Sequence, residues 1–286
     1  MRDLAFGEYK MSYLKKYIPF VKSLKASDFS TEVDPSLLPE QDKKVGGDDY
    51  AYTLWLQGFE QAPDIVKKCI GSMKKEFGEK FILFTEESIW NVISLPSYII
   101  RKREEKKIGA AHIADLIRIE LLYQYGGYWF DATDFLTGTP PEFIKEAPFF
   151  MYMGSKTFLP YMFVQNCFIR SKQGDPLMGM WRKLVHEYWK HEDMACEYFL
   201  VQMLFRLLVT YNEEAKILFS RMPKVPMDVT HVLWHEIGDK PFNKEGYEIM
   251  CGNAFFQKCS YRKMRYGIGE ILPGSFAERV LNGNIE

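Results

Sequence analysis

The sequence predicts an α/β fold in which helices flank a sheet. Residues 51–56 and 80–84 are short runs rich in strand-forming residues. The segment between them has one apolar helical face, which repeats every four residues at Ile65, Cys69, Met73 and Phe77. A strand, a helix and a second strand at this spacing form a βαβ unit, which requires parallel strand pairing. Two further runs, 149–153 and 163–170, predict additional strands.

Composition restricts the class of protein. The chain has 286 residues, of which 47% are hydrophobic and 16% aromatic, so it is long and apolar enough to bury a substantial core. Its formal net charge of -1 lacks the basic footprint of nucleic-acid-binding proteins, so we expect no nucleic-acid partner. The five cysteines are odd in number and include no C-x-x-C pair, which indicates a reducing compartment, and we therefore expect a cytoplasmic location.

The N-terminal residues 8–24 predict a helix that is kinked at Pro19 and carries aromatic side chains beside lysines. Such a helix either packs on its own domain or makes peripheral contact with the inner face of the membrane. Charges interrupt its apolar stretches, so we expect no signal peptide. The longest apolar run, 198–209, is too short to span a bilayer.

The rest of the chain is predicted to be largely helical. The expected helical stretches are 87–93, a proline-broken segment running into 101–107, 109–125, 175–190 and 192–209. Gly126 and Gly127 end the third of these helices and permit a tight reversal into a three-residue strand, 128–130, whose exit carries Asp131. Beyond residue 211 prolines punctuate the pattern, so an irregular C-terminal part is expected.

Asp115 and Arg118 form the first candidate site. They lie three residues apart on the helix before the double glycine and share a face with apolar residues. One interpretation is an internal salt bridge that braces the helix against the sheet. In the other, the carboxylate accepts hydrogen bonds from sugar or ribose hydroxyls while the guanidinium approaches a phosphate.

Asp131 is the second candidate, because it follows a short buried strand in a turn that also contains Thr133 and Asp134. Mg²⁺ and Mn²⁺ take oxygen ligands and are typically held by one or two carboxylates together with substrate phosphates. The turn therefore predicts a divalent cation, Mn²⁺ or Mg²⁺, with Asp131, Thr133 and Asp134 as candidate ligands.

Two neighbouring segments resemble a known family. Residues 111–118 (AHIADLIR) and 122–133 (LYQYGGYWFDAT) are similar to the capsular polysaccharide synthesis glycosyltransferases. These belong with the wider glycosyltransferases that carry a DXD sugar-binding region, to which the large clostridial glucosylating toxins are also similar. Residues 55–69 and 95–99 fit the same pattern, so the resemblance runs from about residue 50 to 139 and more faintly through 189–199.

The resemblance implies a GT-A type fold, with a Rossmann-like mixed sheet flanked by helices. It also implies a metal-dependent hexosyltransferase that retains anomeric configuration. The implied donor is a nucleotide sugar, with a UDP-sugar as the first candidate. Carried over to this chain, Trp55 stacks on the base, Asp115 and Arg118 hold the ribose or donor sugar, and Asp131 faces the metal and diphosphate. Thr133 stands where a DXD motif has its second aspartate, and Asp134 compensates only if it turns inward.

The same resemblance divides the chain and suggests an acceptor. We expect an N-terminal helix and connector over 1–48 and a catalytic domain over 49–286, with a donor half at 49–139 and an acceptor half at 140–286. The expected acceptor is a glycan, including a lipid-linked one, in bacterial capsule or cell-surface polysaccharide synthesis. On the acceptor side, Glu197 is a candidate for orienting or deprotonating the acceptor hydroxyl.

Other interpretations stay open. The basic residues Lys258, Arg262, Lys263 and Arg265 either neutralise the diphosphate or form a solvated face. The missing second carboxylate leaves room for a non-catalytic sugar-nucleotide-binding module, and the toxin resemblance for a protein acceptor. A haloacid dehalogenase type phosphatase is disfavoured because Thr133 replaces its second aspartate. The histidines, His112, His231 and His235, have no third metal ligand nearby and are predicted to be structural or solvated.

Overall fold

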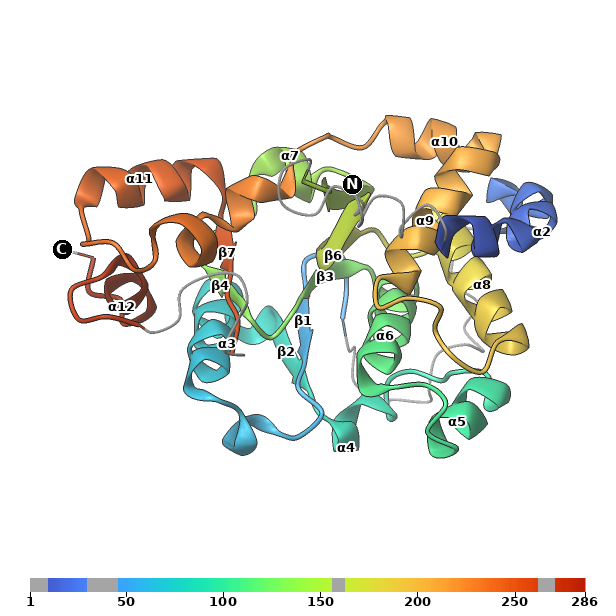
Figure 1. Ribbon diagram of the computed structural model, residues 1–286, viewed down its shortest axis with the longest axis horizontal. Helices are drawn as coiled ribbons and strands as arrows, with labels where there is room; N and C mark the ends of the chain where they lie inside the picture. Colours follow the sequence, from blue (N-terminus) through green and yellow to red (C-terminus); the bar gives the residue numbers. More distant parts are fainter. Residues whose placement is uncertain (1–9, 30–45, 156–162, 262–270, 286) are drawn as a thin grey trace.

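A five-stranded mixed sheet forms the centre of the computed structural model, which describes residues 10–29, 46–155, 163–261 and 271–285 (Figure 1). The strand order is β2-β1-β3-β6-β5. The strands are β1 (Ala51–Leu54), β2 (Phe81–Phe84), β3 (Gly127–Phe130), β5 (Phe149–Met153) and β6 (Val164–Ser171). β1 runs parallel to β2 and β3, whereas β6 is antiparallel to β3 and β5. The predicted mixed α/β sheet is therefore confirmed.

Helices cover both sides of this sheet (Figure 1). They are α3 (Asp64–Phe77), α4 (Glu86–Ile89), α5 (Ser97–Glu104), α6 (Ala110–Tyr125), α7 (Glu142–Lys145), α8 (Pro176–His191) and α9 (Leu200–Tyr211). α3 lies on one side, and α6, α8 and α9 pack together on the other. The apolar period of α3 buries Cys69 and Met73 completely, as the four-residue repeat predicts.

The N-terminal helix packs on its own chain. Residues 10–14 are helical and continue through a 3₁₀ turn, η1 (Lys15–Tyr17), into α2 (Ile18–Ser23), where Pro19 occupies the first turn. The apolar face is buried, with α2 against α9 and the Tyr17 ring beside Tyr188 of α8, and it comprises Leu14, Tyr17, Val21 and Leu24. Residues 8 and 9 of the predicted helix lie outside the described residues. Within the described ranges, no helix combines the length and apolarity that crossing a bilayer requires.

The C-terminal part is more regular than predicted. It contains α10 (Glu213–Ser220), η6 (Met227–Thr230), η7 (Leu233–Ile237), α11 (Lys244–Asn253), β7 (Phe256–Lys258) and α12 (Phe276–Leu281). β7 pairs antiparallel with β4 (Asp134–Leu136), so that Lys258 stands opposite Asp134. A second difference is that α9 begins at Leu200 and not at residue 192.

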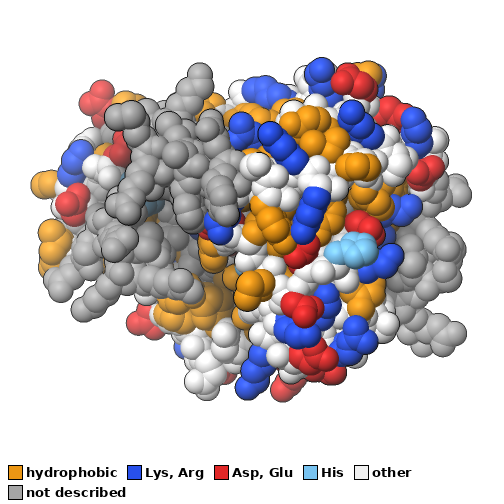
Figure 2. Space-filling model, turned by 45° about the vertical axis from the view of Figure 1, so that its right-hand side comes forward, with side chains coloured by type: hydrophobic (Ala, Val, Ile, Leu, Met, Phe, Trp, Pro, Cys, Tyr) orange, Lys and Arg blue, Asp and Glu red, His pale blue; other side chains and the backbone are white. Residues whose placement is uncertain are grey.

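The surface carries both signs of charge. On the face shown in Figure 2, Lys and Arg side chains alternate with Asp and Glu side chains, and apolar patches lie between them. This mixture agrees with the formal net charge of -1, so local groups and not a general surface field decide which anions bind.

Candidate functional site

A cavity of about 610 Å³ opens at the carboxyl ends of β1 and β3. Ligands of open α/β sheets bind at this edge, and small-molecule sites typically measure roughly 300–1,000 Å³. Its wall combines residues from the start of α6, the turn after β3, strand β6, the η6 and η7 region, and the end of β7. The sequence-predicted residues Trp55, Asp115, Arg118, Asp131 and Thr133 all line this one cavity.

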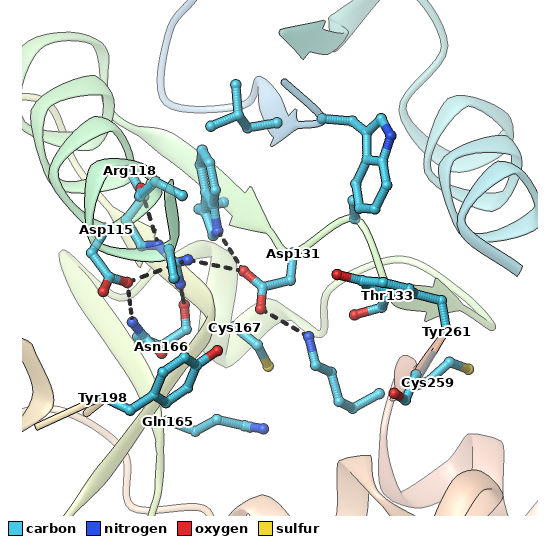
Figure 3. A pocket seen from close by; sticks show the side chains of 18 of the residues that line it. Asp115, Arg118, Asp131, Thr133, Gln165, Asn166, Cys167, Tyr198, Cys259 and Tyr261 are labelled. Atoms are coloured by element: carbon cyan, nitrogen blue, oxygen red, sulfur yellow. Dashed lines mark hydrogen bonds and ion pairs between the residues drawn. The ribbon is translucent and has the colours of Figure 1, made fainter. Parts of the chain in front are cut away.

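Arg118 joins two carboxylates across the cavity wall. Its Nη2 atom lies 3.4 Å from Oδ1 of Asp115 on the same helix and 3.2 Å from Oδ1 of Asp131 (Figure 3). Its Nη1 atom donates to the backbone carbonyl of Asn166 on β6. The guanidinium also lies 5.0 Å from the ring centroid of Trp129. Arg118 is therefore held by both the sheet and the turn, and it holds the two acidic groups in fixed positions.

Asp115 is oriented by a chain of amides that sequence reasoning missed. The Nδ2 atom of Asn166 donates to its Oδ1 atom at 2.9 Å, and the Nε2 atom of Gln202 donates to Oδ1 of Asn166 at 2.7 Å. The other carboxylate oxygen lies 3.5 Å from Nδ1 of His112. Isolated amides carry no motif, so only their positions on β6 and α9 identify them.

Asp131 is an ionised carboxylate. Its Oδ1 atom accepts a hydrogen bond from the indole nitrogen of Trp129 at 3.1 Å, and its Oδ2 atom accepts one from Nζ of Lys258 at 2.8 Å. Burial alone would raise its pKa, but the opposite charges of Lys258 and Arg118 outweigh burial and lower the pKa below its usual value. The group is thus negative at neutral pH.

Asp134 turns away from the cavity. It is fully buried, its Oδ2 atom accepts from the backbone N–H of Asp131 at 3.1 Å, and its Oδ1 atom lies 3.2 Å from Nζ of Lys258. Burial and the neighbouring charge of Asp131 raise its pKa to about 7 against the opposing pull of Lys258. Lys258 itself stays protonated, because its two carboxylate neighbours raise its pKa in spite of burial.

The predicted Mn²⁺ or Mg²⁺ fits these residues poorly. Both oxygens of Asp131 already accept hydrogen bonds and Asp134 is not on the cavity wall, so Thr133, with a neutral hydroxyl, is the remaining predicted ligand that lines the cavity. Hard divalent cations need several free oxygen ligands. No cluster of three or more His, Cys, Asp or Glu side chains suited to a metal occurs in the described part of the chain. The metal therefore stays a prediction.

Trp55 and Tyr261 form an aromatic corner of the cavity. Their rings meet edge to face with centroids 5.5 Å apart. The indole N–H of Trp55 is buried and makes no hydrogen bond within the described structure. An aromatic wall with a free donor suits a planar heterocycle, so the base-stacking role of Trp55 stays a prediction with a compatible setting.

His231 and His235, which were predicted to be structural or solvated, both line the cavity. Their rings stack with centroids 5.4 Å apart, and Nε2 of His231 lies 3.2 Å from Nε2 of Gln165. Burial lowers the pKa of His231 to about 4, so the ring is neutral at pH 7. Their i, i+4 spacing in the sequence is the signal that could have identified them.

The residues predicted for the acceptor side and for the basic cluster only partly line the cavity. Glu197 is not among the lining residues, whereas its neighbours Tyr198 and Phe199 are. Its Oε1 atom accepts from the backbone N–H of Tyr198 at 2.8 Å. The catalytic role of Glu197 stays a prediction. Of the basic cluster, Lys258 lines the cavity, and the other members, Arg262, Lys263 and Arg265, lie outside the described residues.

Comparison with known proteins identifies the family. Residues 6–268 match the model of a family described as "Capsular polysaccharide synthesis protein". Among solved structures the chain is similar to "PaToxG Glycosyltransferase", at 14% identity and a TM-score of 0.36, over 73% of this chain and 79% of that chain. The comparison with curated proteins gave no match. Since the family model spans most of its length, the chain belongs to the capsular polysaccharide synthesis protein family.

Proposed function

We propose that the protein is a glycosyltransferase that moves a sugar from a nucleotide-sugar donor to a glycan acceptor in capsule or cell-surface polysaccharide synthesis. A UDP-sugar is the first candidate for the donor. The observation that carries the proposal is the shared cavity of Asp115, Arg118 and Asp131 in a member of a capsular polysaccharide family. A cavity of about 610 Å³ accommodates a ligand of this size.

Each residue has a role that follows from its contacts. The Oδ2 atom of Asp115, which faces His112 and not the amide chain, accepts a hydrogen bond from a donor-sugar or ribose hydroxyl. Arg118 fixes the positions of Asp115 and Asp131, helps to lower the pKa of Asp131, and presents positive charge toward the phosphates. Trp55 stacks on the base at the aromatic corner that it forms with Tyr261.

The proposed reaction retains configuration by same-face displacement. The bond between the anomeric carbon and the diphosphate oxygen breaks, and its electron pair stays on that oxygen. The acceptor hydroxyl oxygen forms the new bond to the anomeric carbon, and its proton passes to the departing phosphate. This route is favoured because the acidic side chains among the described lining residues, Asp115 and Asp131, are both paired with Arg118 and so are poor nucleophiles.

The acceptor is proposed to be a glycan, including a lipid-linked glycan handled at the inner face of the membrane. The N-terminal helix lends no support to membrane contact, because the apolar face of its described residues is buried against α8 and α9. The two alternatives are a protein acceptor and a binding module without turnover.

The test is a screen for donor hydrolysis across UDP- and GDP-sugars, with the full chain and with Asp115→Ala as its matched control. Release of nucleoside diphosphate from one donor, reduced at least about 100-fold in the variant, supports the proposal. Donor binding without turnover indicates a binding module instead. Phosphate release from small phosphomonoesters, with no donor cleaved, contradicts the proposal outright.

A further inference from the structure

Lys258 contacts two of the three residues of the turn in which the sequence predicts a metal, Asp131 and Asp134. The pairing of β4 with β7 sets its backbone opposite Asp134. From there Nζ reaches Oδ2 of Asp131 at 2.8 Å and Oδ1 of Asp134 at 3.2 Å. Its side chain also lines the cavity and is 20% exposed. One positive charge therefore bridges the two acidic residues of the turn and faces the space for the ligand.

An ammonium group has three N–H donors and no acceptor. Two of these donors point toward the carboxylates of Asp131 and Asp134, which leaves one for a ligand oxygen. We propose that Lys258 takes the place of the divalent cation and holds the diphosphate of the donor through its remaining N–H donor, so that nucleotide binding and turnover need no metal. This inference rests on the proposed glycosyltransferase function.

The local charges support this assignment. Lys258 contacts both Asp131 and Asp134, and Arg118, which is shared with Asp115, adds a second positive charge beside Asp131. A divalent cation in the same turn would have to approach both of these cations or displace Lys258. Displacement is opposed because a strand pair, and not a loop, fixes the backbone of Lys258.

Thr133 is consistent with the same arrangement. It occupies the position of the second DXD aspartate with a neutral hydroxyl. A divalent cation gains from a second carboxylate there, whereas a single ammonium charge is already matched by Asp131 with Asp134 behind it. Thr133 in place of an aspartate would thus weaken a metal site, but it removes no contact that Lys258 makes.

In the reaction, Lys258 stays protonated throughout. As the bond to the anomeric carbon breaks, the electron pair passes to the diphosphate oxygen, and the third N–H of Lys258 donates to that oxygen or its neighbour. The proton of the acceptor hydroxyl passes to the departing phosphate. Lys258 therefore acts by electrostatic stabilisation alone.

The first experiment measures UDP and GDP binding to the full chain by calorimetry, in EDTA and in Mn²⁺. The expected dissociation constants agree within about twofold in the two conditions. Binding that EDTA weakens by about tenfold or more, and Mn²⁺ restores, overturns the role of Lys258 but leaves the glycosyltransferase proposal standing. Absence of binding in both conditions overturns both proposals.

The second experiment compares Lys258→Met with Lys258→Arg, and uses the exposed Lys216→Met as the matched control. Loss of one charge-assisted hydrogen bond predicts about tenfold weaker UDP binding for Lys258→Met, a smaller loss for Lys258→Arg, and none for Lys216→Met. Circular dichroism checks that each variant is folded. Equal losses in the two Lys258 variants, or none, overturn the charge role.

The third experiment tests whether Mn²⁺ binds to the site once Lys258 is removed. Lys258→Ala leaves Asp131 and Asp134 without their shared cation and opens space between them. Titration of Mn²⁺ followed by electron paramagnetic resonance should show binding to this variant and none to the wild-type chain at the same concentrations. Binding of Mn²⁺ to the wild-type chain contradicts the inference without any assay of activity.

Discussion

Asp131 in the turn after β3 lies 3.2 Å from Arg118, which is on the preceding helix and is itself 3.4 Å from Asp115. The three charged groups are thus linked by contacts from α6 to the turn after β3. Because the central guanidinium touches both carboxylates, the positions of the two acidic groups depend on each other. Changes at Arg118 should consequently affect folding and activity together.

Arg118→Gln removes the counter-charge that the buried Asp115 and the partly exposed Asp131 share. We expect the free energy of unfolding to fall by about 3 kcal/mol and donor-hydrolysis kcat/KM to fall by about 100-fold. Denaturant titration and steady-state kinetics measure the two effects. Arg206→Gln, at an exposed arginine of α9 that does not line the cavity, is the control and should change neither quantity. Similar values for the two variants would refute a role for Arg118 in the site.

Gln202 lines the cavity and reaches Asp115 through Asn166. Gln202→Leu keeps most of the side-chain volume but removes the donor to Asn166, so Asp115 loses its orientation and not its charge. We expect kcat/KM to fall by about tenfold, mainly through kcat, with the melting temperature within about 5 °C of wild type. Gln61→Leu, at an exposed position away from the cavity, is the control. An unchanged kcat would show that the amide chain is dispensable.

Local patterns in the sequence predicted the central sheet and its nearest helices. The four-residue period at Cys69 and Met73 and the strand runs on either side need only neighbouring residues to be recognised. The glycines at 126 and 127 likewise marked the end of α6. These features carry the βαβ unit and the position of Asp131, which is why that half of the cavity was predicted.

The other half of the cavity depends on contacts between distant residues. β4 and β7 have three residues each, too few to show a period, and they pair residues more than a hundred positions apart. The bridge from Lys258 to Asp131 and Asp134 arises only from that pairing. Asn166 reaches Asp115 from β6 in the same way. Neither contact has a local sequence signal, so neither was predicted.

At the start of β3, Gly127 lies so close to the backbone of Tyr50 that we expect glycine to be required there. Its φ is +100°, and a Cβ atom there would lie 2.5 Å from the carbonyl oxygen of Tyr50. Gly127→Ala should therefore lower the free energy of unfolding by about 2–4 kcal/mol in urea titrations. Gly71→Ala, within α3 and with nothing within 4 Å of the added atom, should instead raise it by about 0.5–1 kcal/mol. Equal effects would mean that the backbone at Gly127 can relax.

His186 on α8 should make the fold sensitive to acid. Burial lowers its pKa from 6.5 to about 4, with Glu120 opposing and Arg182 reinforcing the shift. Between these pH values the unfolded chain binds a proton at this histidine and the folded chain does not, so stability falls as the pH falls from 6.5 toward 4.

The comparison of wild type with His186→Phe isolates this contribution, because other histidines titrate in both proteins. The unfolding free energy of wild type, measured in urea from pH 7.5 to 4.5, should fall relative to the variant by about 1.4 kcal/mol per pH unit below pH 6.5. Above pH 7 the difference between the two proteins should be constant. Parallel curves across the whole range would show that His186 is protonated as readily in the folded chain as in the unfolded one.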